Sequence, residues 1–249
     1  MNDSAADADE LPILYNDEWL VAVAKPSGLF VHRSNEDRSA TSFVLQQIRD
    51  QLGHFVYPVH RLDRATSGIV VLAKMPEAAS GMGLLFTERR VSKTYQALVR
   101  GFCDDHGSIR IPLVSSLGRG SPAGHPQAAP QDAETHYETR QRFELPLPSG
   151  RYPTTRCSLV EVRPVTGRYH QIRRHFNQIS HPVLGDTSHG DSHQNRFYRN
   201  HLNLTRLMLA AVRLQFPHPV TGQTVLITCP PEVSFQAVID RLQQFQPRA

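Results

Sequence analysis

Cysteine is scarce in this sequence, and its residues do not form the patterns that disulfides or metal sites require. The three cysteines, Cys103, Cys157 and Cys229, lie far apart, and none belongs to a Cys-x-x-Cys pair. Each has apolar neighbours, so we expect buried free thiols in a reducing compartment. A chain of 249 residues can bury a sizeable core, so the fold needs neither disulfides nor a structural metal.

Long apolar runs and a strong charge excess are also absent. No run is long enough to span a bilayer, and the acidic residues 1–10 lack the basic start and apolar stretch of a signal peptide. We expect a cytoplasmic protein with no membrane partner and a disordered tail over residues 1–10. The 27 Lys and Arg against 23 Asp and Glu leave a net charge of +4, which suits a polyanionic partner without requiring one.

The sequence lacks the regular alternation of strands and helices that parallel α/β folds need. Helical patterns are few, at residues 41–52, 77–90, 169–179 and 232–245. Strand-like runs predominate, at residues 13–15, 20–23, 69–73, 94–99, 134–143, 157–163, 207–216 and 224–228. These patterns predict an α+β fold, with a mainly antiparallel mixed sheet flanked by helices and loops, in one domain over residues 11–249. Six Gly and Pro residues within 115–130 predict a mobile surface loop.

A carboxylate lies among basic side chains in the segment His60–Gly68, which reads HRLDRATSG and precedes the apolar run at Ile69. Positive charge from Arg61 and Arg64 favours the ionised form of Asp63. A catalytic carboxylate and a charged surface turn with an ordinary ion pair both fit this pattern, and composition alone favours the surface turn.

Two further segments carry polar groups that could act with this carboxylate. The segment Gly167–Arg173 reads GRYHQIR, and on a helix Arg173 falls about 100° from the apolar stripe that contains Ile172. Its guanidinium could then pair with a carboxylate in a cleft, although a basic solvated helix face is the commoner arrangement. The segment Ser92–Tyr95 places an aromatic side chain on a strand near Lys93; a core tyrosine is the simpler interpretation.

Taken together and in this order, the motifs resemble those of the RluA-type pseudouridine synthases. The resemblance rests on KPSG at Lys25–Gly28, HRLDRATSG, SKTY at Ser92–Tyr95 and GRYHQIR, and it extends from about Ile13 to Thr228. It implies a catalytic domain with a central RNA-binding cleft and no preceding S4 domain. The implied reaction isomerises uridine in RNA to pseudouridine and needs no cofactor.

The resemblance also implies a role for each site residue. Asp63 would be the catalytic carboxylate, paired with Arg173, and Tyr95 would stack on the flipped base and assist proton removal from its C5. Arg61 would fill the gap that the base leaves, and Ile172 would supply an apolar wall. Further substrate-binding residues would be His60, Arg64, Lys93 and Arg168. The implied partner is tRNA, because several stretches resemble a subgroup that modifies a stem uridine near the T arm, at position 65. The alternative is an enzyme of the same family that acts on ribosomal RNA.

Other basic residues are candidates for phosphate contacts, although a solvated side chain is as good an interpretation for each. These candidates are Lys25, Arg33, Arg38, Arg119, Arg151, Arg156, Arg168, Arg174 and Arg196.

Two other classes of protein fit parts of the sequence. A metal hydrolase would use some of the 13 histidines, but His170 and His175 are five residues apart, which places them on different faces of a helix. A non-catalytic RNA-binding protein would need the basic side chains but not the carboxylate of Asp63.

Overall fold

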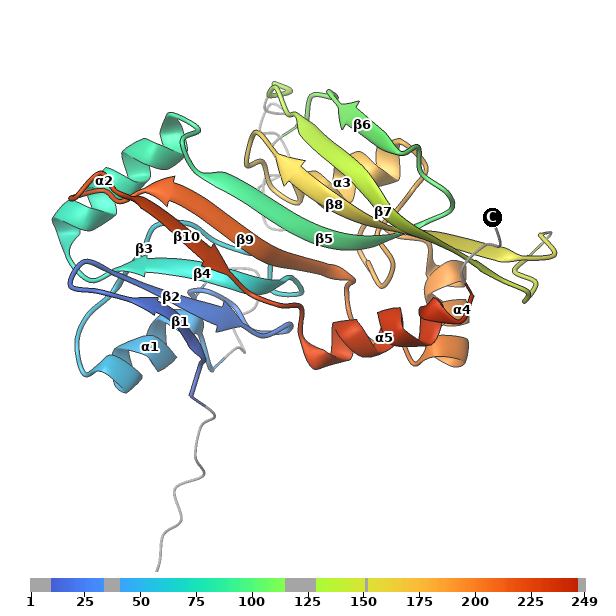
Figure 1. Cartoon of the computed structure of the whole chain (residues 1–249), viewed down its shortest axis with the longest axis horizontal. Coiled ribbons are helices and arrows are strands. Elements are labelled where there is room, and N and C mark those ends of the chain that lie inside the picture. The colour runs from blue at the N-terminus through green and yellow to red at the C-terminus, as the bar shows by residue number, and fades with distance from the viewer. Residues whose placement is uncertain (1–9, 34–40, 115–128, 151, 246–249) are drawn as a thin grey trace, which may run out of the picture.

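A ten-stranded mixed sheet forms the centre of the molecule (Figure 1). The computed structural model describes residues 10–33, 41–114, 129–150 and 152–245. The strand order is β1-β2-β4-β9-β5-β8-β7-β6, with β10 paired to β9 and β3 to β4. The strands are β1 (Ile13–Asn16), β2 (Leu20–Lys25), β3 (Tyr57–Pro58), β4 (Ser67–Ala73), β5 (Ser92–Arg100), β6 (His106–Ile109), β7 (Thr135–Leu145), β8 (Thr155–Pro164), β9 (Leu209–Pro217) and β10 (Thr224–Thr228).

Helices cover both faces of each half of this sheet. They are α1 (Val44–Leu52), α2 (Pro76–Thr87), α3 (Gln171–Gln178), α4 (Ser192–Leu202) and α5 (Val233–Gln243). In the half with β2 and β4, α1 packs in one core cluster and α2 in another. In the half with β5 and β8, α3 packs in one cluster, and α4 and α5 in a second. The α+β fold with a mainly antiparallel sheet is therefore confirmed.

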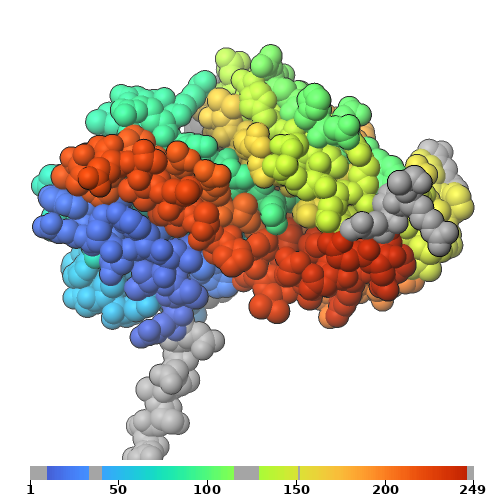
Figure 2. All heavy atoms as spheres, viewed as in Figure 1, coloured from blue at the N-terminus to red at the C-terminus, as the bar shows by residue number. Residues whose placement is uncertain are grey.

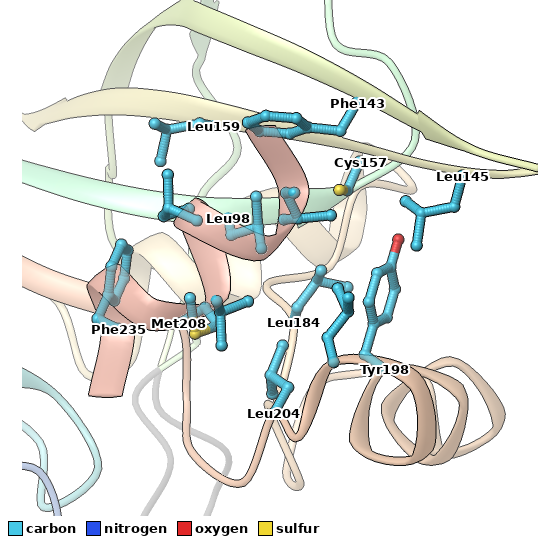
Figure 3. Close-up of a cluster of buried hydrophobic side chains, with 14 of the residues drawn as sticks. Leu98, Phe143, Leu145, Cys157, Leu159, Leu184, Tyr198, Leu204, Met208 and Phe235 are labelled. Carbon is cyan, nitrogen blue, oxygen red and sulfur yellow. The ribbon is translucent and has the colours of Figure 1, made fainter. Parts of the chain in front are cut away.

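The cluster beneath α4 and α5 shows how residues from distant segments close the second half (Figure 3). Leu98 from β5, Phe143 from β7 and Phe235 from α5 belong to it. Tyr198 from α4 is a further member, and its hydroxyl donates to the backbone carbonyl of Arg156 over 3.2 Å. Cys157 is buried there, and Cys103 and Cys229 are also buried free thiols, as expected.

The two halves meet where β4 lies parallel to β9, the one parallel pairing among the described strands. The pairing spans only Ser67 and Gly68 against Ala210 and Ala211. Gly68 has φ +110°, and a Cβ on it would lie 2.1 Å from the carbonyl oxygen of Ala211. Only glycine fits this junction, because the positive φ and the close backbone approach both exclude a side chain.

The first and last strands of the chain lie on the same side of the molecule. Figure 2 shows the N-terminal hairpin, in blue, beside the β9–β10 hairpin, in orange-red, and β1 and β10 contact each other. Within the described part of the chain, no helix combines the length and apolar character needed to cross a bilayer.

Several local expectations differ from the structure. The start of α1 is Val44 rather than the region of Thr41, because backbone carbonyls of Phe30 and Val31 accept the first helical N–H groups and no side-chain cap is needed. Helix α4 and strand β6 were not expected. The predicted loop 115–130 lies outside the described residues except for its last two, as does the predicted tail 1–10 except for Glu10.

Candidate active site

The loop that carries Asp63 connects β3 to β4, and the segment Lys25–Gly28 donates hydrogen bonds to its backbone. The Arg64 carbonyl accepts hydrogen bonds from the Gly28 N–H at 2.8 Å and from Lys25 Nζ at 3.0 Å. Ser27 Oγ donates to the Ala65 carbonyl at 2.8 Å. Two of the sequence motifs therefore form one structural unit, in which the first fixes the backbone of the second.

Lys25 is part of this support, and the expectation that it contacts phosphate was wrong. Its side chain is 1% exposed, and Nζ also donates to the carbonyls of Pro26 and Leu29. Burial lowers the pKa of Lys25 to about 7, although the nearby charge of Asp63 raises it. All its donors are turned toward backbone oxygens inside the fold, where RNA cannot reach them.

Arg173 lies between two carboxylates. Its Nη1 donates to Asp63 Oδ2 at 3.1 Å, while Nε and Nη2 donate to Asp186 Oδ2 at 2.7 Å and Oδ1 at 2.8 Å. The side chain of Asp63 is 20% exposed, whereas those of Arg173 and Asp186 are 6% and 0% exposed. Burial opposes the charge of Arg173, but its hydrogen bonds with Asp186 and the charges of both carboxylates raise its pKa.

Two histidines approach Asp63 from a second direction. His170, at φ +52° just before α3, has Nε2 at 3.7 Å from Asp63 Oδ2, and its Nδ1 lies 2.8 Å from Nε2 of His189. Its ring stacks on Tyr169 with 3.7 Å between the centroids. Burial lowers the pKa of His170 to about 4, so the imidazole is neutral at physiological pH.

Tyr95, Lys93 and His60, which were expected to contact the substrate, lie around the same cavity as Asp63. Burial and the charge of Asp63 raise the pKa of Tyr95, so its phenol keeps its proton. Burial lowers the pKa of Lys93 to about 8, and its Nζ donates to the Thr166 carbonyl at 3.3 Å. His60 Nε2 accepts from the Val71 N–H at 2.9 Å, and burial lowers its pKa to about 4. His60 is thus a neutral ring fixed to β4.

These side chains line a single cleft of ≈ 700 Å³ between the two halves of the sheet. The structure brings eight of the nine expected site residues to it: His60, Arg61, Asp63, Lys93, Tyr95, Arg168, Ile172 and Arg173. The ninth, Arg64, does not line the cleft. Its Nε donates to the Gly28 carbonyl and its guanidinium lies over the Phe30 ring, so Arg64 contacts the backbone and side chain of residues 28–30 rather than the cleft.

The remaining phosphate candidates are dispersed. Arg156 pairs with Glu144, and Arg174 donates to the carbonyls of Val114 and Tyr169. Arg33 and Arg196 are exposed. Arg38, Arg119 and Arg151 lie outside the described residues.

Asp186 and the supporting role of Lys25 were not anticipated, and His189 was considered only as part of a possible metal-ligand cluster at His189–His193. The sequence offers no clear signal for Asp186, since the residues after Gly185 are polar or glycine as far as Asp191. The structure gives no support to the metal-hydrolase alternative, since among the described residues no three His, Cys, Asp or Glu side chains are placed to hold one ion. His175, the second helical histidine, instead hydrogen-bonds Thr135 Oγ1 and the Ile111 carbonyl.

Comparison with known proteins shows the family of the chain. The family model described as RNA pseudouridylate synthase matches residues 19–178, which include Asp63, Tyr95 and Arg173. The chain belongs to the RNA pseudouridylate synthase family. The resemblance inferred from the motifs is thereby confirmed.

Curated relatives in this family are similar over nearly the whole chain. A tRNA pseudouridine synthase C of Pasteurella multocida is 48% identical over 87% of this chain and 90% of its own length. A tRNA pseudouridine synthase C of Pectobacterium carotovorum is 46% identical over 92% of this chain, which spans 61% of that relative. The solved structure of human RNA Pseudouridylate Synthase Domain Containing 1 is 26% identical, with a TM-score of 0.69 over 96% of this chain and 97% of its own.

Proposed function

We propose that this pseudouridine synthase isomerises a uridine in a tRNA stem, with Asp63 as its catalytic carboxylate. The observation that carries the proposal is the contact between Asp63 and Arg173 inside the cleft, where a cationic hydrogen-bond donor orients a half-buried carboxylate. We take residues 11–249 as one catalytic domain that acts in the cytoplasm, where tRNA is found.

The reaction breaks the N1–C1′ bond and forms a C5–C1′ bond, while the C5 proton leaves and N1 gains a proton. No electrons are gained or lost overall, so the chemistry requires no redox cofactor. Asp63 can serve as an anion in two ways. It can attack the ribose C1′, or it can act as a base in an elimination through a glycal.

A uracil inside a stem is stacked and out of reach, so it must be flipped into the cleft, which costs a few kcal/mol. Arg61, on the rim beside Asp63, suits the gap that the base leaves. Tyr95 and Ile172, which face the cleft from β5 and α3, suit the two sides of the flipped ring. Lys93 and Arg168 add positive charge for the phosphates nearby.

The choice of tRNA rests on the relatives whose names specify it, together with the length over which this chain resembles them. Position 65 is the finer part of the proposal and rests on the subgroup resemblance of the sequence.

The test is release of tritium from tRNA labelled at C5 of uridine. We expect stoichiometric release by the wild type with chelator present, and none by Asp63→Asn, which keeps the shape of the side chain but not its charge. Release by the variant at the wild-type rate would refute the role of Asp63, whereas no release by the wild type would favour a protein that only binds RNA through its basic groups. Release from ribosomal RNA but not from tRNA would refute the substrate.

A further inference from the structure

Asp186 makes the largest set of contacts of any carboxylate near the cleft, yet it lies behind the reacting groups. Its Oδ1 accepts from Arg173 Nη2 at 2.8 Å and from the N–H groups of Ser188 and His189 at 2.9 and 3.0 Å. Its Oδ2 accepts from Arg173 Nε at 2.7 Å. Both oxygens are thus used, and no face of the carboxylate is left for substrate.

The bidentate hydrogen bond between Asp186 and Arg173 determines which N–H group of Arg173 can reach Asp63. A guanidinium prefers to bind a carboxylate through two parallel N–H donors. Because Asp186 holds Nε and Nη2, only Nη1 is directed at Asp63, and it reaches a single oxygen. The other oxygen of Asp63 accepts no hydrogen bond from Arg173, so it can face the ribose.

A second chain of contacts also runs from Asp186 to Asp63. The His189 N–H donates to Asp186, and the His189 ring is hydrogen-bonded to His170, whose Nε2 faces Asp63. The neighbouring carboxylate favours a proton on Nε2 of His170, so Nδ1 accepts and His189 Nε2 donates. Arg173 Nη1, at 3.1 Å, and His170 Nε2, at 3.7 Å, therefore approach the same Oδ2 of Asp63.

The turn that carries Asp186 is itself fixed. Asn195 on α4 donates to the Asp186 carbonyl at 2.8 Å and accepts from the Gly185 N–H at 2.8 Å. A Cβ on Gly190 would lie 2.2 Å from the Asp186 carbonyl oxygen, so the turn closes tightly. Burial raises the pKa of Asp186, but Arg173 and the two backbone N–H groups lower it below its ordinary value, so the group is an anion.

We propose that Asp186 is a positioning residue that orients Arg173 and His189, and through them the carboxylate of Asp63, for the isomerisation proposed above. It does not touch the substrate. By binding Nε and Nη2 of Arg173, Asp186 makes the contact between Arg173 and Asp63 monodentate rather than bidentate. One oxygen of Asp63 is then left to face the sugar.

The test compares Asp186→Asn with Asp191→Asn in tritium release from C5-labelled tRNA. Asp191 is the matched control, because it also accepts two backbone N–H groups, from His193 and Gln194, and pairs with an arginine, Arg100, but does not reach Asp63. We expect Asp186→Asn to lower kcat about 100-fold with KM for tRNA within a factor of about three, since a misplacement of about 1 Å costs that much. The control should retain the wild-type kcat.

A second comparison separates positioning from folding. Arg173→Met leaves Asp186 buried without a cation, which lowers Tm strongly. Adding Asp186→Asn to Arg173→Met should restore much of that Tm but leave kcat at the value of Arg173→Met alone. A purely structural Asp186 would instead let stability and kcat recover together.

The proposal is overturned if folded Asp186→Asn keeps kcat within about three-fold of the wild type, if the loss lies in KM, or if the two substitutions multiply their effects on kcat. Wild-type release is measured first. A wild type that releases no tritium overturns the proposed function, whereas failure of the positioning role shows only in the variants.

Discussion

At the residue scale, the phenol of Tyr95 and the carboxylate of Asp63 share one cleft, and this affects what Tyr95 can do. Burial and the negative charge of Asp63 both raise the pKa of the phenol, so no phenolate is present to remove the C5 proton. Stacking on the base requires only the ring. The structure therefore favours the stacking part of the role expected from the sequence.

Replacing Tyr95 with Phe tests this choice, because Phe keeps the ring and removes the hydroxyl. We expect Tyr95→Phe to retain tritium release within about ten-fold of the wild type, whereas Tyr95→Leu, which lacks a ring to stack, should lose about 1–3 kcal/mol of base binding. Single-turnover release at saturating enzyme measures both. Complete loss of release in Tyr95→Phe would show that the hydroxyl takes part in proton transfer.

Lys93 supplies a pH dependence in tRNA binding. Burial lowers its pKa to about 8, so the ammonium is present below this pH and is lost as the pH rises through it. A phosphate contact needs the ammonium, and so the affinity for tRNA should fall between pH about 7 and about 9. In Lys93→Arg the guanidinium stays charged, and this decrease should be smaller in a filter-binding titration at constant salt. Equal pH profiles for the two proteins would exclude Lys93 from phosphate binding.

The contrast between Asp63 and Asp186 shows what sequence could predict at this scale. Asp63, Tyr95 and Arg173 belong to motifs with recognisable order, so the sequence alone is enough to select them. Asp186 meets Arg173 only because the chain turns back after α3, and Lys25 points inward because three carbonyls converge on it. Such contacts depend on tertiary geometry that local pattern does not encode.

At the scale of elements, regular apolar periodicity was the reliable signal. The strand Thr224–Thr228 was predicted with its observed bounds, and the continuous apolar run of β4 is buried along its whole length. Helix α4 was missed because SHQNRFYRNHL is mostly polar, and its buried stripe contains Gln194 beside Tyr198 and Leu202. Its clearest signal is Asp191, whose side chain caps the first turn.

The junction of β4 and β9 provides a test at the same scale. Gly68→Ala should lower the free energy of unfolding by about 3 kcal/mol or more, because the positive φ and the 2.1 Å approach to Ala211 force the strands apart. Gly83→Ala is the control: it lies within α2 with no atom within 4 Å of the new Cβ, and should stabilise the fold by about 1 kcal/mol. Urea unfolding measures both, and equal effects would contradict the close packing.

At the scale of the whole molecule, the position of the positive charge matters more than its net value of +4. On the outer strands β7 and β8, arginines are paired with neighbouring carboxylates: Arg163 contacts Glu138 and Glu161, and Arg140 contacts the same two residues. In the cleft, Arg168 and Lys93 donate to backbone carbonyls, and neither is paired with a carboxylate among the residues that the structure describes. We therefore expect the cleft to attract RNA more strongly than β7 and β8 do.

This distribution predicts which arginines control the salt dependence of tRNA binding. Each phosphate contact adds about 0.7 to 0.9 to the slope of log affinity against log salt. Arg168→Gln should therefore reduce the slope by about that amount, whereas Arg163→Gln, which removes a charge already paired with Glu138 and Glu161, should leave it unchanged. Titrations between about 50 and about 200 mM salt measure the slope. An equal reduction in both variants would mean that RNA spreads across the outer strands, and that the cleft is only one part of a wider binding surface.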